Sequence, residues 1–283
     1  MSIKRILVPL TGYSEATETV LCALALAQRL RAHVTVTETT VGPMPYLENA
    51  DMTGISYAET MKAMEDGRRH AQARARQCFD KAVAASKVAV VDRPPHDGAS
   101  VAWVDSAPFE GNVISHLGRM SDLVVARRPG DVPMADVDVL EAAIFSVRRP
   151  VLLVPPHHGA LGSGIAVAWN GSLEAADALE RAVDVHVTGA AATLIQVGEL
   201  PAGGVPAQEA VNYLAWHGVV ASVKVVADEP KATAMVLMRE AKASGAGLLV
   251  MGAYSHSRLR EMVFGGVTAH MISKSVMPVL LAH

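Results

Sequence analysis

The chain contains 283 residues, 51% of them hydrophobic, and carries a formal net charge of −3 at pH 7. Such a length and composition can fill the cores of two globular domains and exclude a disordered chain. The slight negative charge provides no basic field for nucleic acid, so no nucleic-acid partner is expected. No run of about 18 apolar residues is present, and the N-terminal apolar run is too short for a signal peptide, so we expect neither a membrane span nor export.

Two cysteines, Cys22 and Cys78, lie within Ala-rich stretches of helical character. Neither belongs to a CxxC pair or lies near histidine at the spacing of a metal site, so both are expected to be reduced thiols in the protein interior. Reduced cysteines favour the cytoplasm as the location of the protein.

The first half of the chain alternates apolar runs typical of strands with helical patterns. Strands are expected near residues 4–9, 33–38, 99–104, 122–126 and 151–154. A helix near 57–87 carries many Lys and Arg residues, which we interpret as a solvated surface; a binding site for a polyanion is the alternative.

The second half shows the same alternation. Strands are expected near 164–169, 191–197, 219–226, 247–252 and 278–282, and helices near 173–186, 206–217, 229–244 and 259–275. Runs such as "GLLVMG" are apolar without alternation, which is typical of strands covered on both faces. The sequence therefore predicts an α/β fold with parallel sheets between layers of helices, and ligand sites beyond the carboxyl ends of the strands.

The two halves repeat the same segments in the same order. The stretch "ILVPLTGYSEA" from Ile6 corresponds to "IAVAWNGSLEA" from Ile165, at an offset of 159 residues, and the final "PVLL" runs correspond at an offset of 128. The difference indicates an insertion near 41–87 in the first copy. Repeats of this length indicate a duplication of whole domains, which we place at 1–156 and 162–283. The two PVLL strands are expected to pair within the chain and so to cover each other's edges.

Glycines punctuate the last strand-to-helix connection of the second half. Gly252 ends a strand, and Gly265 and Gly266 precede a helix expected to begin near Val267. Backbone amides at a helix N-terminus bind phosphate oxygens without any lysine, and glycine lets a ligand approach the main chain closely. The alternative is that these glycines only form turns. A valine in place of Gly252 or Gly265 is expected to abolish nucleotide binding and leave the fold largely intact.

The stretch "GAYSHSRLREMVFGGVTAHMISKSVMPVLLA" resembles the closing signature of the universal stress protein family, G-x2-G-x9-G-[ST]-x-[ST] followed by a P-V-L strand. Both opening strands, "ILVPLTGY" and "IAVAWNGS", resemble the family's "ILVAVDGS", so the resemblance extends over a tandem pair of domains. It implies two Rossmann-like domains, similar to adenine nucleotide alpha hydrolases. Each is expected to be a five-stranded parallel sheet flanked by helices, and the two are expected to be related by a pseudo-twofold axis.

The resemblance also implies a ligand, because one subgroup of the family binds ATP or AMP and has no established catalytic triad. In that subgroup the residue after the first strand holds the base or ribose, a backbone group of the second strand meets adenine, and the glycine signature holds ribose and phosphates. The corresponding positions of this chain are Asn170, Val197, Gly252, Ser255, Gly265, Gly266 and Val267.

Three of these positions depart from the nucleotide-binding pattern. Asn170 replaces an acid and makes only uncharged hydrogen bonds to a ribose. Ser255 replaces the second glycine and brings a side chain to a backbone position that favours positive φ. Gly266 replaces a hydroxyl residue but keeps the backbone amide.

The first half departs further from the pattern. Thr11 follows its first strand, and Arg127, Val137 and Asp138 stand where the second half has Gly252, Gly265 and Gly266. We expect these side chains to crowd the loop and the carboxylate of Asp138 to satisfy helix amides in place of a ligand. The first domain is therefore expected to be a nucleotide-free partner.

Several function classes lack their motifs. The chain has no GxxxxGK[ST], no GxGxxG after an opening strand and no HxxxH or HExxH metal pattern, and residues 252–260 contain no acid to hold a metal near phosphates. Three interpretations remain: a stress-response protein that binds an adenine nucleotide in its second domain, a scaffold with both pockets degenerate that acts through protein contacts, or an enzyme, for which no site residue argues. Assembly into a homodimer is left open.

Overall fold

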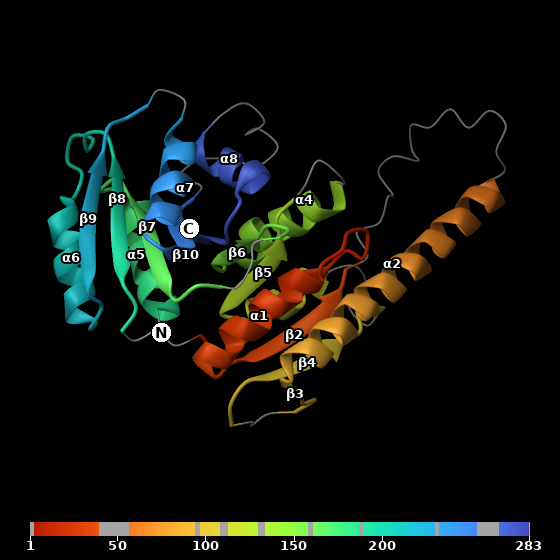
Figure 1. Ribbon diagram of the computed structural model, residues 1–283. Coiled ribbons are helices and arrows are strands. Elements are labelled where there is room, and N and C mark those ends of the chain that lie inside the picture. Colours follow the sequence, from red (N-terminus) through yellow and green to blue (C-terminus); the bar gives the residue numbers. More distant parts are fainter. Residues whose placement is uncertain are drawn as a thin grey trace.

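The computed structural model describes residues 3–39, 57–93, 97–107, 113–129, 134–157, 161–186, 189–229, 232–253 and 266–282. Strands and helices alternate along the chain, and the strands form one continuous sheet with helices on both faces (Figure 1). We call the part up to residue 157 the N-terminal half and the part from residue 161 the C-terminal half.

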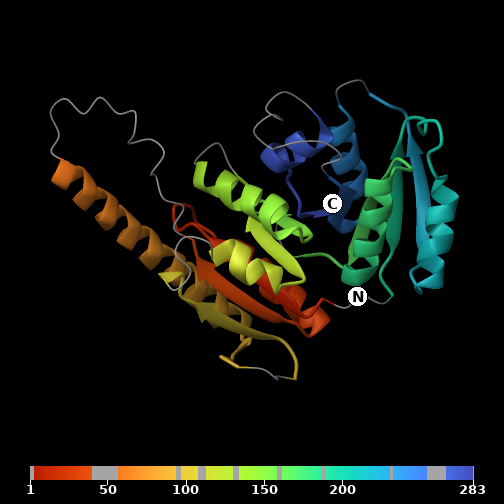
Figure 2. The same ribbon diagram turned by 180° about the vertical axis from the view of Figure 1, so that it is seen from behind.

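The N-terminal half begins with a buried strand and contains the longest helix of the described chain. Its elements are β1 (Arg5–Leu10), α1 (Thr17–Leu30), β2 (His33–Glu38), α2 (Tyr57–Ser86), β3 (Ala89–Val90), β4 (Ser100–Val104), α3 (Val113–Arg119), β5 (Leu123–Arg127), α4 (Met134–Glu141), the π-helical segment η3 (Ala142–Val147) and β6 (Val151–Val154). In both views α2 projects well beyond the edge of the sheet (Figures 1 and 2).

The C-terminal half has a more regular alternation of strands and helices. Its elements are β7 (Gly164–Trp169), α5 (Leu173–Val185), β8 (Ala192–Val197), α6 (Ala207–Trp216), β9 (Ala221–Val226), α7 (Thr233–Ala243), β10 (Ala246–Gly252), α8 (Val267–Lys274) and β11 (Val279–Ala282). Most predicted elements differ from these bounds by one or two residues. Helices α7 and α8 begin later than predicted, and residues 254–265, part of the expected helix near 259–275, lie outside the described residues.

The sheet has 11 strands in the order β3-β4-β2-β1-β5-β6-β11-β10-β7-β8-β9. The order β4-β2-β1-β5-β6 of the N-terminal half repeats as β9-β8-β7-β10-β11 in the C-terminal half, and the strands within each half are parallel. The predicted α/β, Rossmann-like fold is therefore confirmed. The short edge strand β3 was not predicted, because its two residues are too few to show a periodic pattern.

The two halves meet where β6 and β11, the two PVLL strands, lie side by side. They are antiparallel, with Val151 opposite Leu281 and Leu153 opposite Val279, and both strands are fully buried. Each strand thus supplies the hydrogen-bonding edge that the other would expose at the end of a five-stranded sheet.

Two hydrophobic clusters cover the two faces of the sheet. Helices α1, α2, α5 and α6 pack on one face, and α3, α4 with η3, α7 and α8 pack on the other. Strand side chains such as Ile6 and Val250 face the first cluster, while Leu7 and Leu249 face the second. Both faces of these strands are buried, which explains why their apolar residues do not alternate with polar ones, as the sequence predicted.

Both cysteines are buried and free of disulfides, as expected. Burial raises the pKa of the Cys22 thiol to about 12, so this thiol stays protonated at neutral pH. No helix in the described ranges combines the length and the apolar character needed to cross a membrane.

Candidate functional site

A cavity of about 260 Å³ opens at the carboxyl ends of β7, β8 and β10 in the C-terminal half. Strand β7 has β8 on one side and β10 on the other, so the chain changes direction across the sheet at this point. Such a switch in strand order leaves a crevice between the loops on either side. The cavity is lined by Ala168, Trp169, Asn170, Ser172, Glu174, Ala175, Ile195, Val197, Thr233, Leu237, Met251, Gly252, Ala253, Val267 and Thr268.

Three helices begin at the wall of this cavity. Ser172 is the N-cap of α5, Thr233 is the first residue of α7, and Val267 and Thr268 open α8. The first N–H groups of a helix have no partner within the helix, and the helix dipole places partial positive charge there. This end of the cavity is therefore suited to a ligand rich in oxygen acceptors.

The remainder of the wall is mainly apolar, with Ile195, Leu237 and Met251 at the strand and helix surfaces. Among the described lining residues Glu174 is the one charged side chain, and none is basic. An anionic ligand group would thus be held by backbone amides and hydroxyls instead of a lysine or arginine.

Asn170 lies at the cavity, as predicted, but its side chain has a local partner. Its Oδ1 accepts a hydrogen bond from the backbone N–H of Ser172 at 3.1 Å. The Oγ of Ser172 in turn accepts from the N–H of Ala175 at 3.3 Å and caps α5. The asparagine oxygen therefore shapes the turn into α5, a role that short polar side chains often take.

Gly252 also lies at the cavity, and the structure gives the absence of its side chain a role in packing. A Cβ added there would lie 2.4 Å from the backbone oxygen of Glu174, at the start of α5. The absent side chain therefore lets α5 pack directly on the end of β10. Since the obstacle is main chain, a valine here would disturb the fold, contrary to our expectation.

The start of α8 brings together the other predicted residues that the structure describes. Gly266 is the N-cap, with φ 131° and ψ 157°, a region that is essentially restricted to glycine. Val267 lines the cavity as predicted, and so does Val197 from the end of β8. The two remaining candidates, Ser255 and Gly265, lie outside the described residues.

Sequence reasoning missed two threonines of the wall. Thr268 occupies the second hydroxyl position of the G-[ST]-x-[ST] signature, so the motif already contained the signal for it. Thr233 belongs to no motif, and its Oγ1 donates to Asp228 Oδ1 at 3.3 Å. Only the packing of α7 against β8 brings it to the cavity.

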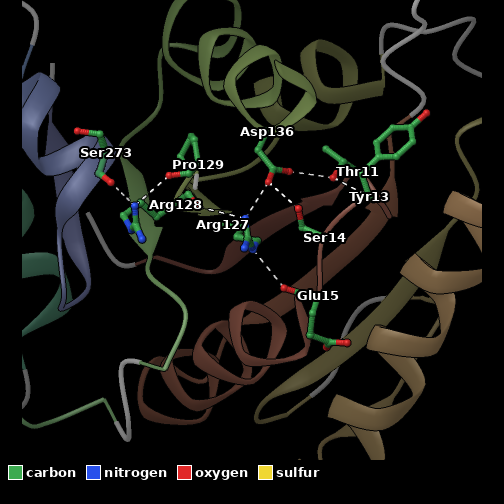
Figure 3. Close-up of polar contacts among 9 residues, drawn as sticks. All are labelled: Thr11, Tyr13, Ser14, Glu15, Arg127, Arg128, Pro129, Asp136 and Ser273. Atoms are coloured by element: carbon green, nitrogen blue, oxygen red, sulfur yellow. Dashed lines mark hydrogen bonds and ion pairs between the residues drawn. The ribbon is translucent and has the colours of Figure 1, made fainter. Parts of the chain in front are cut away.

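The corresponding place in the N-terminal half is almost filled. Its cavity measures about 10 Å³ and is lined by Pro9, Leu10, Thr11, Ser14, Ala16, Arg127, Asp136 and Val139. Figure 3 shows that the carboxylate of Asp136 points toward Thr11, Ser14 and Arg127. Of the side chains predicted to crowd this half, Arg127 lines the cavity, whereas Val137 and Asp138 do not.

The carboxylate that fills the N-terminal cavity is Asp136, not Asp138. Helix α4 begins at Met134, so Asp136 lies in its first turn and is 5% exposed. Its Oδ1 accepts from Thr11 Oγ1 at 2.9 Å. Its Oδ2 accepts from Ser14 Oγ at 3.1 Å and from Arg127 Nη1 at 2.9 Å. The alignment that selected Asp138 ignored the exact start of the helix, which the sequence pattern fixes only to within several residues.

Arg127 occupies the position that corresponds to Gly252. Its Nε donates to the backbone oxygen of Glu15 at 3.2 Å, and Glu15 corresponds to Glu174 in the repeat (Figure 3). In the C-terminal half the main chain at this position approaches Gly252 directly, whereas in the N-terminal half an arginine side chain fills the space and donates to the main chain.

The described residues contain no group of three or more His, Cys, Asp or Glu side chains placed to hold a metal ion. A search of curated proteins gives no match to the chain. Residues 199–283 match the model of the universal stress protein family. These residues make up most of the C-terminal half. The N-terminal half repeats its strand order, which gives the chain the tandem arrangement.

Solved structures support the same fold over the whole chain. A universal stress protein from Archaeoglobus fulgidus DSM 4304 is 19% identical, with a TM-score of 0.65, and the match covers 99% of this chain and 96% of that one. A putative universal stress protein from Pseudomonas aeruginosa UCBPP-PA14 is 17% identical, with a TM-score of 0.53 and coverage of 99% and 93%. A universal stress protein in complex with cAMP matches 44% of this chain and 99% of its own, at 19% identity and a TM-score of 0.35.

Proposed function

We propose that this chain is a tandem universal stress protein, a non-enzymatic stress-response protein that binds an adenine nucleotide, ATP or AMP, in its C-terminal half. The observation that carries the proposal is the cavity of about 260 Å³ at the switch in strand order, where three helices begin. Its volume lies just below the range of about 300–1,000 Å³ that is usual for small-molecule sites.

The lining divides the cavity into two environments that match the two ends of a nucleotide. In the proposed complex the base lies against the apolar wall near Val197 and Ile195, and the phosphates lie at the first turn of α8. The hydroxyl of Thr268 and the amides after Gly266 are the proposed phosphate donors. Metal-assisted hydrolysis would need several metal-holding acids, and Glu174 is the one acid of the described wall, so we propose binding without turnover.

We further propose that residues 1–156 form a nucleotide-free domain that pairs with the domain of residues 162–283. The N-terminal cavity of about 10 Å³ has room for about one water molecule and not for a ribose. The antiparallel pairing of β6 with β11 is the proposed seam between the domains.

A pair of tryptophan variants tests the nucleotide site. Val197→Trp places a large ring in the cavity from the end of β8, whereas Val90→Trp makes the same change at an exposed position on β3. We expect AMP or ATP to raise the melting temperature of the native chain and of Val90→Trp, because a ligand that binds only the folded state stabilises it. Val197→Trp should lose this response.

Two results would contradict the nucleotide proposal. One is a native chain that releases no nucleotide on denaturation and shows no change in melting temperature with ATP or AMP. The other is an equal nucleotide response in Val197→Trp and Val90→Trp, which would place the ligand elsewhere on the protein.

A second candidate function, action through protein contacts, is favoured by an exposed apolar surface. Strand β9 ends the sheet of the described residues, and beside it Trp216 is 90% exposed, with Val220 and Val225 also exposed. An unpaired edge strand next to apolar side chains favours edge-to-edge pairing, so we propose a homodimer formed through β9. Sedimentation analysis tests it: Trp216→Ser should shift a dimer toward monomer, and a native chain that is monomeric at all concentrations would contradict the proposal.

A further inference from the structure

Glu174 is the one charged side chain among the described residues that line the candidate nucleotide cavity. It lies in the first turn of α5, two residues after the N-cap Ser172, and is partly buried. Its carboxylate makes no hydrogen bond or ion pair with a residue that the structure describes. Both carboxylate oxygens can therefore accept hydrogen bonds from a ligand.

The neighbouring side-chain oxygens in the turn from β7 into α5 already have partners. Asn170 Oδ1 accepts from the backbone N–H of Ser172 at 3.1 Å, and Ser172 Oγ accepts from the backbone N–H of Ala175 at 3.3 Å. Both oxygens hold the start of α5 in place. Among the described side chains of this turn that line the cavity, Glu174 is thus the acceptor that remains for a ligand.

The strand order places Glu174 near the middle of the proposed nucleotide. Strands β8, β7 and β10 are consecutive in the sheet. The proposed base lies at the end of β8, and the proposed phosphates lie at the start of α8, which follows β10, so the ribose has to cross the ends of β7 and β10. Glu174 lies there: a Cβ added to Gly252, the last residue of β10, would be 2.4 Å from the backbone oxygen of Glu174 and 2.6 Å from its Cβ.

The chemistry of a carboxylate determines which part of a nucleotide it can bind. An ionised carboxylate accepts hydrogen bonds and cannot donate them, so it repels phosphate groups, and the apolar side chains of the wall offer it no donor. The hydroxyls at C2′ and C3′ of a ribose are two adjacent, uncharged donors, and the two oxygens of one carboxylate can accept from both. Such hydrogen bonds are charge-assisted and about twice as strong as those between neutral groups.

We propose that Glu174 selects ribonucleotides over 2′-deoxyribonucleotides by accepting hydrogen bonds from the ribose hydroxyls. This inference rests on the proposed binding of an adenine nucleotide and names the part of the nucleotide that the protein distinguishes. A site that hydrogen-bonds a hydroxyl group of its ligand discriminates against the analogue that lacks it, because the acceptor of the site is then left without its donor. Glu174 is therefore a specificity-determining residue of the cavity.

Calorimetric titration of the full chain with AMP and with 2′-deoxy-AMP, both in the presence of EDTA, tests the proposal. We expect the native chain to bind AMP about tenfold more tightly than 2′-deoxy-AMP, because the deoxynucleotide lacks one hydrogen bond to a charged group. Glu174→Gln should reduce this preference to about twofold or less, since a neutral amide oxygen accepts weaker hydrogen bonds. The change in the preference isolates the contact between this side chain and the 2′-hydroxyl.

Asp177→Asn is the matched control for the loss of one negative charge from α5. Asp177 is exposed on the same helix and is absent from the described lining of the cavity, so this variant should keep the tenfold preference. An acid in the first turn also stabilises a helix through the helix dipole. If Glu174 had only that structural role, Glu174→Gln would lower the melting temperature and leave the preference for AMP unchanged, which would overturn the proposal.

Two further results would overturn the role of Glu174 while nucleotide binding stands. One is equal binding of AMP and 2′-deoxy-AMP by the native chain. The other is an effect of Glu174→Gln on AMP binding that appears only when Mg²⁺ replaces EDTA, which would assign the carboxylate to a metal ion held together with the phosphates. A native chain that binds neither nucleotide would contradict the proposed function itself, and the selection of ribose would fall with it.

Discussion

The two halves of the chain share one strand order but differ in what occupies the carboxyl edge of the sheet. In the C-terminal half the crevice is a cavity of about 260 Å³, whereas in the N-terminal half it measures about 10 Å³. The difference comes from side chains and not from topology, because Arg127 and Asp136 bring an internal ion pair to the place where the other half has Gly252 and the start of α8. A duplicated fold can thus keep its architecture while one copy becomes a filled, structural domain.

The largest effect is expected from removal of the carboxylate that fills the N-terminal cavity. Asp136→Ala would leave the largely buried guanidinium of Arg127 and the hydroxyls of Thr11 and Ser14 without their acceptor. Loss of one partner from a buried ion pair costs about 3–5 kcal/mol. Urea denaturation should show this decrease in the free energy of unfolding.

An exposed ion pair provides the control for that experiment. Asp80 pairs with Arg76 at 3.1 Å on the surface of α2. Because exposed pairs contribute about 0–1 kcal/mol, Asp80→Ala should change the free energy of unfolding only slightly. Equal losses in Asp136→Ala and Asp80→Ala would show that the N-terminal network does not stabilise its half.

A smaller but clear effect is expected from Gly252→Ala. The new methyl group would lie 2.4 Å from the backbone oxygen of Glu174, and main chain cannot rotate away as a side chain can. Overpacking of this kind costs about 1–3 kcal/mol. Thermal unfolding should show the loss, while Gly67→Ala, in the interior of α2 with open space around it, should be neutral or stabilising by up to about 1 kcal/mol.

Gly266→Ala tests the backbone conformation at the N-cap of α8 without introducing a steric clash. Among the described residues no atom beyond the chain neighbours lies within 4 Å of the Cβ that alanine would add, but φ of 131° is unfavourable for any residue with a side chain. We expect a loss of about 1–2 kcal/mol in the free energy of unfolding, concentrated in α8. Hydrogen exchange of the α8 amides is the measurement, and unchanged protection would show that α8 tolerates another N-cap geometry.

The smallest effect is expected at the N-cap of α5. Ser172 caps α5 through its side chain, whereas Ala16, the N-cap of the corresponding helix α1, has no side chain that could cap it. Ser172→Ala should cost about 1 kcal/mol of stability. A denaturation midpoint identical to that of the native chain would show that the turn formed by Asn170 is sufficient to start α5.

The sequence predicted the fold well because its strands and helices are strongly patterned. The bounds of β2, β6 and β7 are those expected, since continuous apolar runs flanked by turns mark buried strands clearly. At the site the motif correctly selected Val267 and Gly266 for the start of α8. It missed the packing of Glu174 on Gly252, because a one-dimensional pattern shows that a side chain is absent but not which neighbour requires its absence.

The sequence alone determined the alternation of strands and helices and the apolar faces of the sheet, because these depend on periodicity within a short segment. It also determined the duplication, because both halves repeat the same segments in the same order. Only the tertiary structure decided that Asp136 closes one crevice, that Thr233 lines the other and that Glu174 packs on Gly252. These contacts join segments far apart in the chain, such as Thr11 and Asp136, which are 125 residues apart. Their distances depend on how whole helices pack on the sheet, and a shift of one residue in a helix start changes which side chain reaches the site.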